Sequence, residues 1–221
     1  MKKQNKTIKR AVALLLLLCT LIGSLTCFSA CTLGAPKVDK IYDRVVELIE
    51  AAQELNTVFY GAGLPVYAQD SEYAELNHLY FNFEHTGYQI VSDFAKFKSV
   101  DEIKAAAEKV FSTAYLEDVL YNNAFVGYAI EDGAGGSVMA EPRYYDDGSW
   151  IYRLKNDTDY LTGGIRIYDY STMKIVAPSN GKACTLSISS YLPSDPSFIL
   201  TDTIRIVKQE DGLWYLDSFT G

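Results

Sequence analysis

Histidine and cysteine, which most catalytic and metal-binding sites require, are scarce in this sequence. Only two of the 221 residues are histidines, His78 and His85, and they lie seven residues apart, so a strand would direct them to opposite faces. No His-Glu-x-x-His motif occurs, and after residue 31 Cys184 is the one cysteine, so no closely spaced pair of cysteines is present there. The composition therefore argues against a zinc site or a histidine-based triad, and we expect no catalytic residue, no metal and no cofactor.

Acidic residues are absent from the first thirty positions, which carry five basic residues followed by an apolar run that starts at Ala11 and breaks at Gly23. This layout is typical of a secretory signal, and the run is shorter than the roughly 20 residues of a membrane-spanning helix. The next residues, Phe28-Ser29-Ala30-Cys31, resemble the bacterial lipobox. We therefore predict a lipoprotein signal peptide over 1–30, lipid attachment at Cys31, and a location on the extracytoplasmic face of the cell membrane.

Removal of the signal peptide makes the chain strongly acidic. Lys plus Arg falls from 20 to 15 while Asp plus Glu stays at 28, so the formal charge changes from −8 to −13. This charge argues against nucleic acid as a partner and against attraction to anionic lipid headgroups, and it suits a basic partner. Apart from its lipid, the protein is thus expected to contact another envelope protein or ligand.

Cys184 is the cysteine left over, because Cys19 and Cys27 leave with the signal and Cys31 carries the lipid. An intramolecular disulfide is then excluded. A lone cysteine in an exported protein can be a reactive thiol. The alternation of Cys184 with Leu186 and Ile188 favours a small, buried apolar side chain instead.

The spacing of apolar residues divides the chain into a short tether over 31–39 and a single domain over 40–221. From Lys37 apolar residues recur every three or four positions until Gly61 to Pro65, which predicts one long helix. Ser99-Val100-Asp101-Glu102 has the form of a capping box and predicts a second helix. A break is expected at Phe111-Ser112-Thr113, then a short third helix that ends near Asn122-Asn123.

The second half of the chain alternates with period two, which predicts antiparallel strands. Apolar residues alternate around Tyr152, Leu186, Ile204 and Tyr215, and turns are expected where the alternation stops, at Asp147-Gly148, Ser179-Asn180-Gly181 and Asp211-Gly212. The stretch 77–83 reads as an extra strand or an ordered loop. Helices first and strands afterwards predict an α+β fold, in which N-terminal helices pack on a strongly curved, cone-like antiparallel sheet.

This layout, with the closing strand pair Ile204–Leu216 and its acidic-Gly turn, resembles the nuclear transport factor two-like (cystatin-like) fold. The resemblance implies the fold but no activity, because such folds carry enzymes, ligand binders and passive partners alike. The stretches Ala51–Gly61, Ser99–Ile103 and Val110–Leu116 resemble secreted inhibitors of cell-wall DL-endopeptidases in Gram-positive bacteria. That resemblance implies an acidic surface loop that blocks a peptidase cleft.

Two groups of residues are candidates for function. Asp202 and Asp217 alternate with apolar strand residues, so either one is a candidate acid inside a pocket. The acidic-aromatic cluster Tyr144, Tyr145, Asp146 and Asp147 is a candidate partner surface; it lacks the Asp-x-Asp-x-Asp spacing of a calcium loop, and turn chemistry also explains it. The sequence therefore favours a lipid-anchored binding domain, with a small pocket enzyme (isomerase, hydratase or hydrolase) or a small-molecule binder as alternatives.

Overall fold

The structure is a computed structural model that describes residues 34–67, 87–131, 136–155, 161 and 164–220. The predicted signal peptide with Cys31, both histidines and the stretch 77–83 lie outside the described residues. Among the described residues, none of the helices has the length and apolar character needed to span a bilayer.

A single long helix, α2 (Val38–Phe59), forms the axis of the molecule, as its apolar spacing predicts. One stripe of the helix is buried, including Val45, Leu48, Ile49 and Ala52. The chain turns sharply after the helix at Gly63, whose φ of +73° is a left-handed conformation, and a Cβ there would lie 2.8 Å from the Arg153 side chain. The predicted stop is therefore confirmed.

The predicted capping box begins the second helix, α4 (Val100–Ala107). Ser99 Oγ accepts a hydrogen bond from the Glu102 amide at 3.1 Å, and the Glu102 carboxylate accepts one from the amide of Lys98 at 2.7 Å. A short helix, α5 (Thr113–Tyr115), follows the predicted break and continues into two π-helical turns, η2 (Leu116–Leu120) and η3 (Asn122–Val126).

Helical structure thus extends past Asn122-Asn123, where the sequence predicted its end, and this prediction was wrong. The extra turn is held by packing, since Ala124 is buried and the Phe125 ring lies 6.0 Å from that of Phe59.

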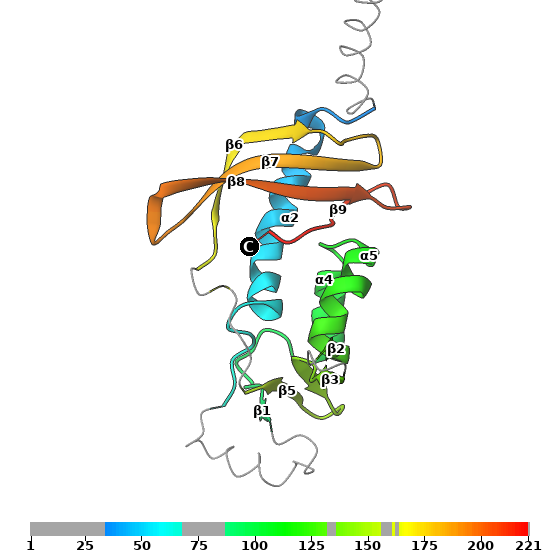
Figure 1. Cartoon of the computed structure of the whole chain (residues 1–221), viewed down its shortest axis with the longest axis vertical. Coiled ribbons are helices and arrows are strands. Elements are labelled where there is room, and N and C mark those ends of the chain that lie inside the picture. The colour runs from blue at the N-terminus through cyan, green and yellow to red at the C-terminus, as the bar shows by residue number, and fades with distance from the viewer. Residues whose placement is uncertain (1–33, 68–86, 132–135, 156–160, 162–163, 221) are drawn as a thin grey trace, which may run out of the picture.

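The largest sheet is an antiparallel meander in the order β6-β7-β8-β9. Its strands are β6 (Ile167–Val176), β7 (Ala183–Leu192), β8 (Asp195–Lys208) and β9 (Trp214–Leu216). Strand β7 alternates as predicted, burying Cys184, Leu186, Ile188 and Ser190. Figure 1 shows α2 crossing one face of this sheet and running on toward the opposite end of the molecule.

A smaller antiparallel sheet, in the order β1-β5-β4, lies at that opposite end. It is built from β1 (Tyr88–Ile90), β5 (Ile151–Leu154) and β4 (Tyr144–Asp146), and β2 (Tyr128–Glu131) pairs with β3 (Ser137–Ala140) in a separate hairpin. The α+β class is confirmed. The strongly curved, cone-like sheet is not, because the described strands form three sheets and none of them closes.

The buried apolar residues form one main cluster that joins α2, α4, the π-helical turns and the large sheet. A second cluster of Tyr67, Tyr88, Ile90 and Tyr152 lies in the small sheet. Arg143 and Tyr144 connect the small sheet to the end of α2. Arg143 donates to the Phe59 carbonyl at 2.6 Å and to that of Gly61, and the Tyr144 hydroxyl donates to the Val58 carbonyl at 2.9 Å.

Candidate functional site

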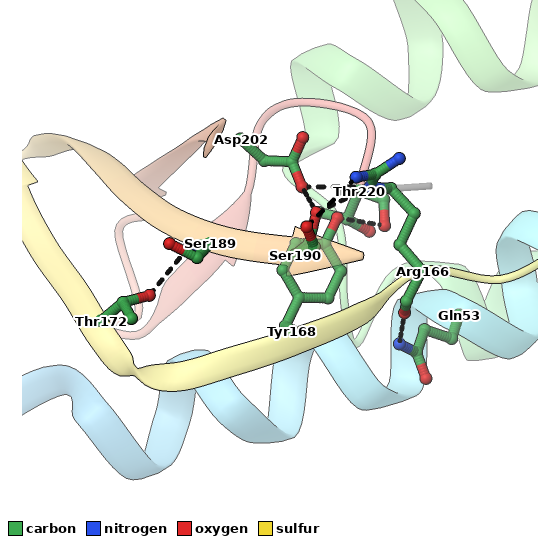
Figure 2. A network of polar contacts seen from close by, with 8 residues as sticks. All are labelled: Gln53, Arg166, Tyr168, Thr172, Ser189, Ser190, Asp202 and Thr220. Atoms are coloured by element: carbon green, nitrogen blue, oxygen red, sulfur yellow. Dashed lines mark hydrogen bonds and ion pairs between the residues drawn. The ribbon is translucent and has the colours of Figure 1, made fainter. Parts of the chain in front are cut away.

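Asp202 lies in a polar network between β6, β7 and β8 (Figure 2). Its carboxylate accepts a hydrogen bond from the hydroxyl of Ser190, which is fully buried, and lies 3.3 Å from Arg166 Nε. The same Arg166 Nε donates to Ser190 Oγ at 2.7 Å, and Gln53 of α2 donates to the Arg166 carbonyl at 3.0 Å. The network therefore anchors α2 to the sheet.

The C-terminal residues close this network on the other side. Tyr168 donates its hydroxyl hydrogen to the Thr220 carbonyl at 2.7 Å, and Asn56 of α2 donates to the Thr220 hydroxyl at 3.0 Å. Burial, followed by the charge of Asp202, raises the pKa of Tyr168 well above its usual value. Tyr168 is therefore a neutral hydrogen-bond donor and not a proton acceptor at physiological pH.

Asp217, the second predicted acid, is also held by neighbouring side chains. Its carboxylate accepts from the Ser112 hydroxyl and from Arg205 Nε at 2.8 Å. Nearby, the hydroxyls of Tyr60 and Tyr115 lie 3.3 Å apart, and burial first, then the contact with Tyr60, raises the pKa of Tyr115. Asp217 fixes the last residues of the chain against α5 and β8.

The predicted surface of Tyr144, Tyr145, Asp146 and Asp147 is not one exposed patch, and this part of the prediction needs correction. Tyr144 is 1% exposed, because it packs beneath the end of α2, where its hydroxyl also accepts from the Leu64 amide. Asp146 caps α4 by accepting from the Val100 amide at 3.0 Å. Only Tyr145 and Asp147 remain at the surface.

Asp147 holds the turn that it begins. It accepts from the amides of Ser149 and Trp150, both at 2.8 Å, and from the Tyr152 hydroxyl at 2.9 Å. Partial burial raises the pKa of Asp147, but these hydrogen bonds outweigh that effect and hold the pKa below its ordinary value. The expectation that turn chemistry explains this aspartate is therefore supported by its contacts.

Cys184 is buried, and its thiol donates to the Asn180 carbonyl at 3.4 Å. Burial raises the pKa of the thiol despite this hydrogen bond, which disfavours the reactive thiolate. Within the described ranges, no three histidine, cysteine or acidic side chains come together as metal ligands.

A groove of about 410 Å³ runs between α2 and α4, and neither Asp202 nor Asp217 lines it. Its floor is apolar, formed chiefly by Leu48, Leu55, Phe97 and Val110. Its rim carries ion pairs between Arg44 and Glu47, at 3.0 Å, and between Lys96 and Glu54, at 2.5 Å. The volume is within the range of roughly 300–1,000 Å³ that is usual for small-molecule sites.

Within the part of the chain that the structure describes, the most exposed apolar segment is the tip of the β7–β8 hairpin, residues 191–200, here called the hairpin tip. Phe198 is 60% exposed, Ile199 64% and Leu200 37%. A two-residue turn joins the strands, since Leu192 pairs with Asp195. In Figure 1 this orange hairpin extends past α2, so the helix does not cover it.

Sequence reasoning missed the hairpin tip, although a signal was present. Three successive large apolar residues in a strand place apolar side chains on both faces, whereas a strand with one face on the core needs only alternate ones. Pro193 lies in the turn and Pro196 follows it, and the fixed φ of proline limits the conformational freedom of this segment.

Comparison of the chain with protein-family models, with curated proteins and with solved structures gave no match.

Proposed function

We propose that this protein is a lipid-anchored binding domain on the extracytoplasmic face of a cell membrane, and that the hairpin tip contacts a partner protein. The observation that carries the proposal is the exposure of Phe198 and Ile199 on a short-turned hairpin. Exposed apolar segments of this kind are characteristic of interaction sites. The two predicted acids are held in ion pairs and line neither the groove nor the hairpin tip, which favours binding over catalysis.

More specifically, we propose that the protein modulates or inhibits cell-wall DL-endopeptidases. The sequence resemblance supports this proposal, and the protruding hairpin is of a size that the cleft of a peptidase can accept. The acidic charge of the chain agrees with a basic partner surface. The antiparallel meander crossed by α2 also supports a nuclear transport factor two-like fold as a proposal.

Crosslinking in cells tests the hairpin tip. A photoreactive residue at Ile199 should capture one defined envelope protein, whereas the same residue at Val126, which is equally exposed at 64%, should not. Phe198→Ser should weaken the capture at position 199. Identical adducts from both positions would refute a specific role for the hairpin tip.

An assay with purified DL-endopeptidase tests the proposal that the protein inhibits these enzymes. DL-endopeptidase activity should fall when the protein is added, and a Phe198→Ser/Ile199→Ser variant should inhibit at least tenfold less well, as expected for loss of central apolar contacts. Full peptidase activity in the presence of wild-type protein would rule out inhibition.

The lipid anchor has a separate test. Cys31→Ala should abolish incorporation of radiolabelled fatty acid and remove the protein from the membrane fraction. Wild-type labelling of the variant would show that Cys31 is not the attachment site.

A small-molecule binder is the second candidate, favoured by the volume and apolar floor of the α2–α4 groove. Ala51 lines this groove and is exposed, so Ala51→Trp should fill the groove without entering the core. If the groove takes a ligand, an apolar fluorescent probe should bind the wild-type protein and bind the variant at least tenfold more weakly.

A further inference from the structure

A second, smaller pocket lies beside the small sheet, away from the hairpin tip. Its volume is about 240 Å³, and Trp150 forms part of its wall together with Ser92, Asp93, Lys98 and Ser149. This is less than the roughly 300–1,000 Å³ of sites for drug-sized ligands, so the pocket has room for one ring and not for an extended molecule.

The pocket combines two aromatic side chains, Trp150 and Phe97, with polar groups that have few partners of their own. Ser92 is 6% exposed, and within the described residues neither its hydroxyl nor the Asp93 carboxylate takes part in a hydrogen bond or ion pair. Both residues line the pocket, and neither polar group is sealed inside the core without a partner, so both can bond to a ligand in the pocket.

The backbone around the pocket is firmly held, so these groups are arranged before a ligand arrives. The Val91 amide donates to the Ile151 carbonyl at 2.9 Å, and the Ser92 amide to that of Pro65 at 2.8 Å. The Asp93 amide donates to the Tyr67 hydroxyl at 3.1 Å, and Asp147 fixes the Trp150 amide. Such preorganisation lowers the entropy cost of binding.

We propose that this pocket binds a single pyranose ring of a gluco-configured sugar, with the Trp150 indole against the face of the ring. The hydroxyls of such a ring are equatorial, so both of its faces present C–H groups that pack on an aromatic plane. The ring edge needs both donors and acceptors, which the Asp93 carboxylate, the Lys98 ammonium and the serine hydroxyls supply. This site is separate from the hairpin tip and does not depend on the function proposed for it.

Fluorescence of the full chain tests the proposal, because the protein has two tryptophans and Trp214→Phe leaves Trp150 alone. Purification requires a detergent without a sugar headgroup, which would otherwise compete. Glucose and N-acetylglucosamine are the two probes; each is a single ring, and they distinguish a plain from an acetamido sugar. A saturable change of Trp150 emission with either probe is the expected result.

Variants then locate the bound sugar. Asp93→Asn and Ser92→Ala should each weaken the binding about tenfold, as removal of one hydrogen-bonding group predicts. Calorimetry should show that Trp150→Phe, which keeps an aromatic face, binds within about threefold of the wild type, while Trp150→Leu binds more than tenfold more weakly. Because Asp93 is exposed, Asp93→Asn keeps the test valid if Trp150→Leu does not fold. The absence of a saturable change with both probes, or binding that the Asp93 and Ser92 variants leave unaltered, would overturn the proposal.

Discussion

At the scale of single residues, two aspartates that precede glycine set the geometry of two hairpins in the same way. Asp147 and Asp211 each accept from a backbone amide two residues later and from a tyrosine hydroxyl, that of Tyr152 at 2.9 Å and that of Tyr215 at 2.6 Å. The tyrosine hydrogen bond is the largest cause that lowers the pKa of Asp211. Both turns have the sequence Asp-Gly-x-Trp, as Asp147-Gly148-Ser149-Trp150 and Asp211-Gly212-Leu213-Trp214, and these contacts indicate that the shared pattern serves to build the turn.

The lowered pKa of Asp147 predicts a pH-dependent effect of Asp147→Asn. Since the pKa in the folded state lies below the ordinary 3.8, the carboxylate stabilises the fold above that pH and loses its contribution as the pH falls through the folded value. Asp147→Asn should therefore lower the free energy of unfolding at neutral pH, and the difference from wild type should shrink below about pH 4. Urea unfolding at a series of pH values measures this; a difference that stays constant with pH would contradict it.

Among the charged side chains of the small sheet, we expect the removal of the buried Arg143 to lower the free energy of unfolding most. Its guanidinium satisfies carbonyls at the end of α2, and each buried carbonyl left without a partner costs about 1–3 kcal/mol. Arg143→Met should lower the free energy of unfolding by about 2–4 kcal/mol. Arg143→Lys should recover only part of this, because one ammonium does not reproduce the planar fork. A loss below about 0.5 kcal/mol on urea unfolding of Arg143→Met would show that the cap is unimportant.

At the scale of elements, α4 depends on a cap that comes from another part of the chain. Asp146 of β4 accepts from the Val100 amide, so the helix is capped both by Ser99 and across the fold. Asp146→Ala should lower the free energy of unfolding by about 1 kcal/mol, as loss of an N-cap group does. Asp146→Asn, which keeps an acceptor oxygen, is the matched control and should lose less. Equal losses in the two variants would indicate that the contact with α4 is not the cause.

The elements also show how far the sequence could predict the structure. Periodicity placed α2, and the capping box placed the start of α4, because local patterns and local hydrogen bonds determine both. Alternation places Leu200 on the same face of its strand as Ile204 and Ile206, yet Leu200 is exposed, because α2 does not reach that end of β8. The pattern of a strand does not show where the element that covers it ends.

The candidate site was harder to predict than the elements. Trp150 meets Ser92 and Asp93 only because β5 pairs with β1, across nearly sixty residues of chain. Alternation with apolar residues predicts Asp202 and Asp217 as candidate acids inside a pocket, whereas the structure holds them in ion pairs with Arg166 and Arg205, which lie on positions that carry no motif. Pairing between distant strands is tertiary information, which alternation alone does not contain.

At the scale of the whole molecule, the two apolar clusters differ greatly in size. The main cluster includes most of the buried residues from α2, α4 and the large sheet, whereas the second contains four residues of the small sheet and its neighbours. Free energies of local opening follow the amount of buried contact, so the two ends of the molecule should open independently. Arg143 and Tyr144 donate to carbonyls at the end of α2, and Arg153 of β5 donates to the Ala62 and Leu64 carbonyls just after it.

Native-state hydrogen exchange should resolve this difference. Amides of β7 and the middle of α2 should exchange only through global unfolding, whereas those of β1 and β5 should exchange through an opening of lower free energy that depends less on urea. Arg143→Met should speed exchange in β1 and β5 more than in β7, because it loosens the connection between the clusters. Equal protection of both sheets in the wild type, with an equal change in the variant, would mean that the molecule opens as one cooperative unit and that the small sheet owes its stability to the main core.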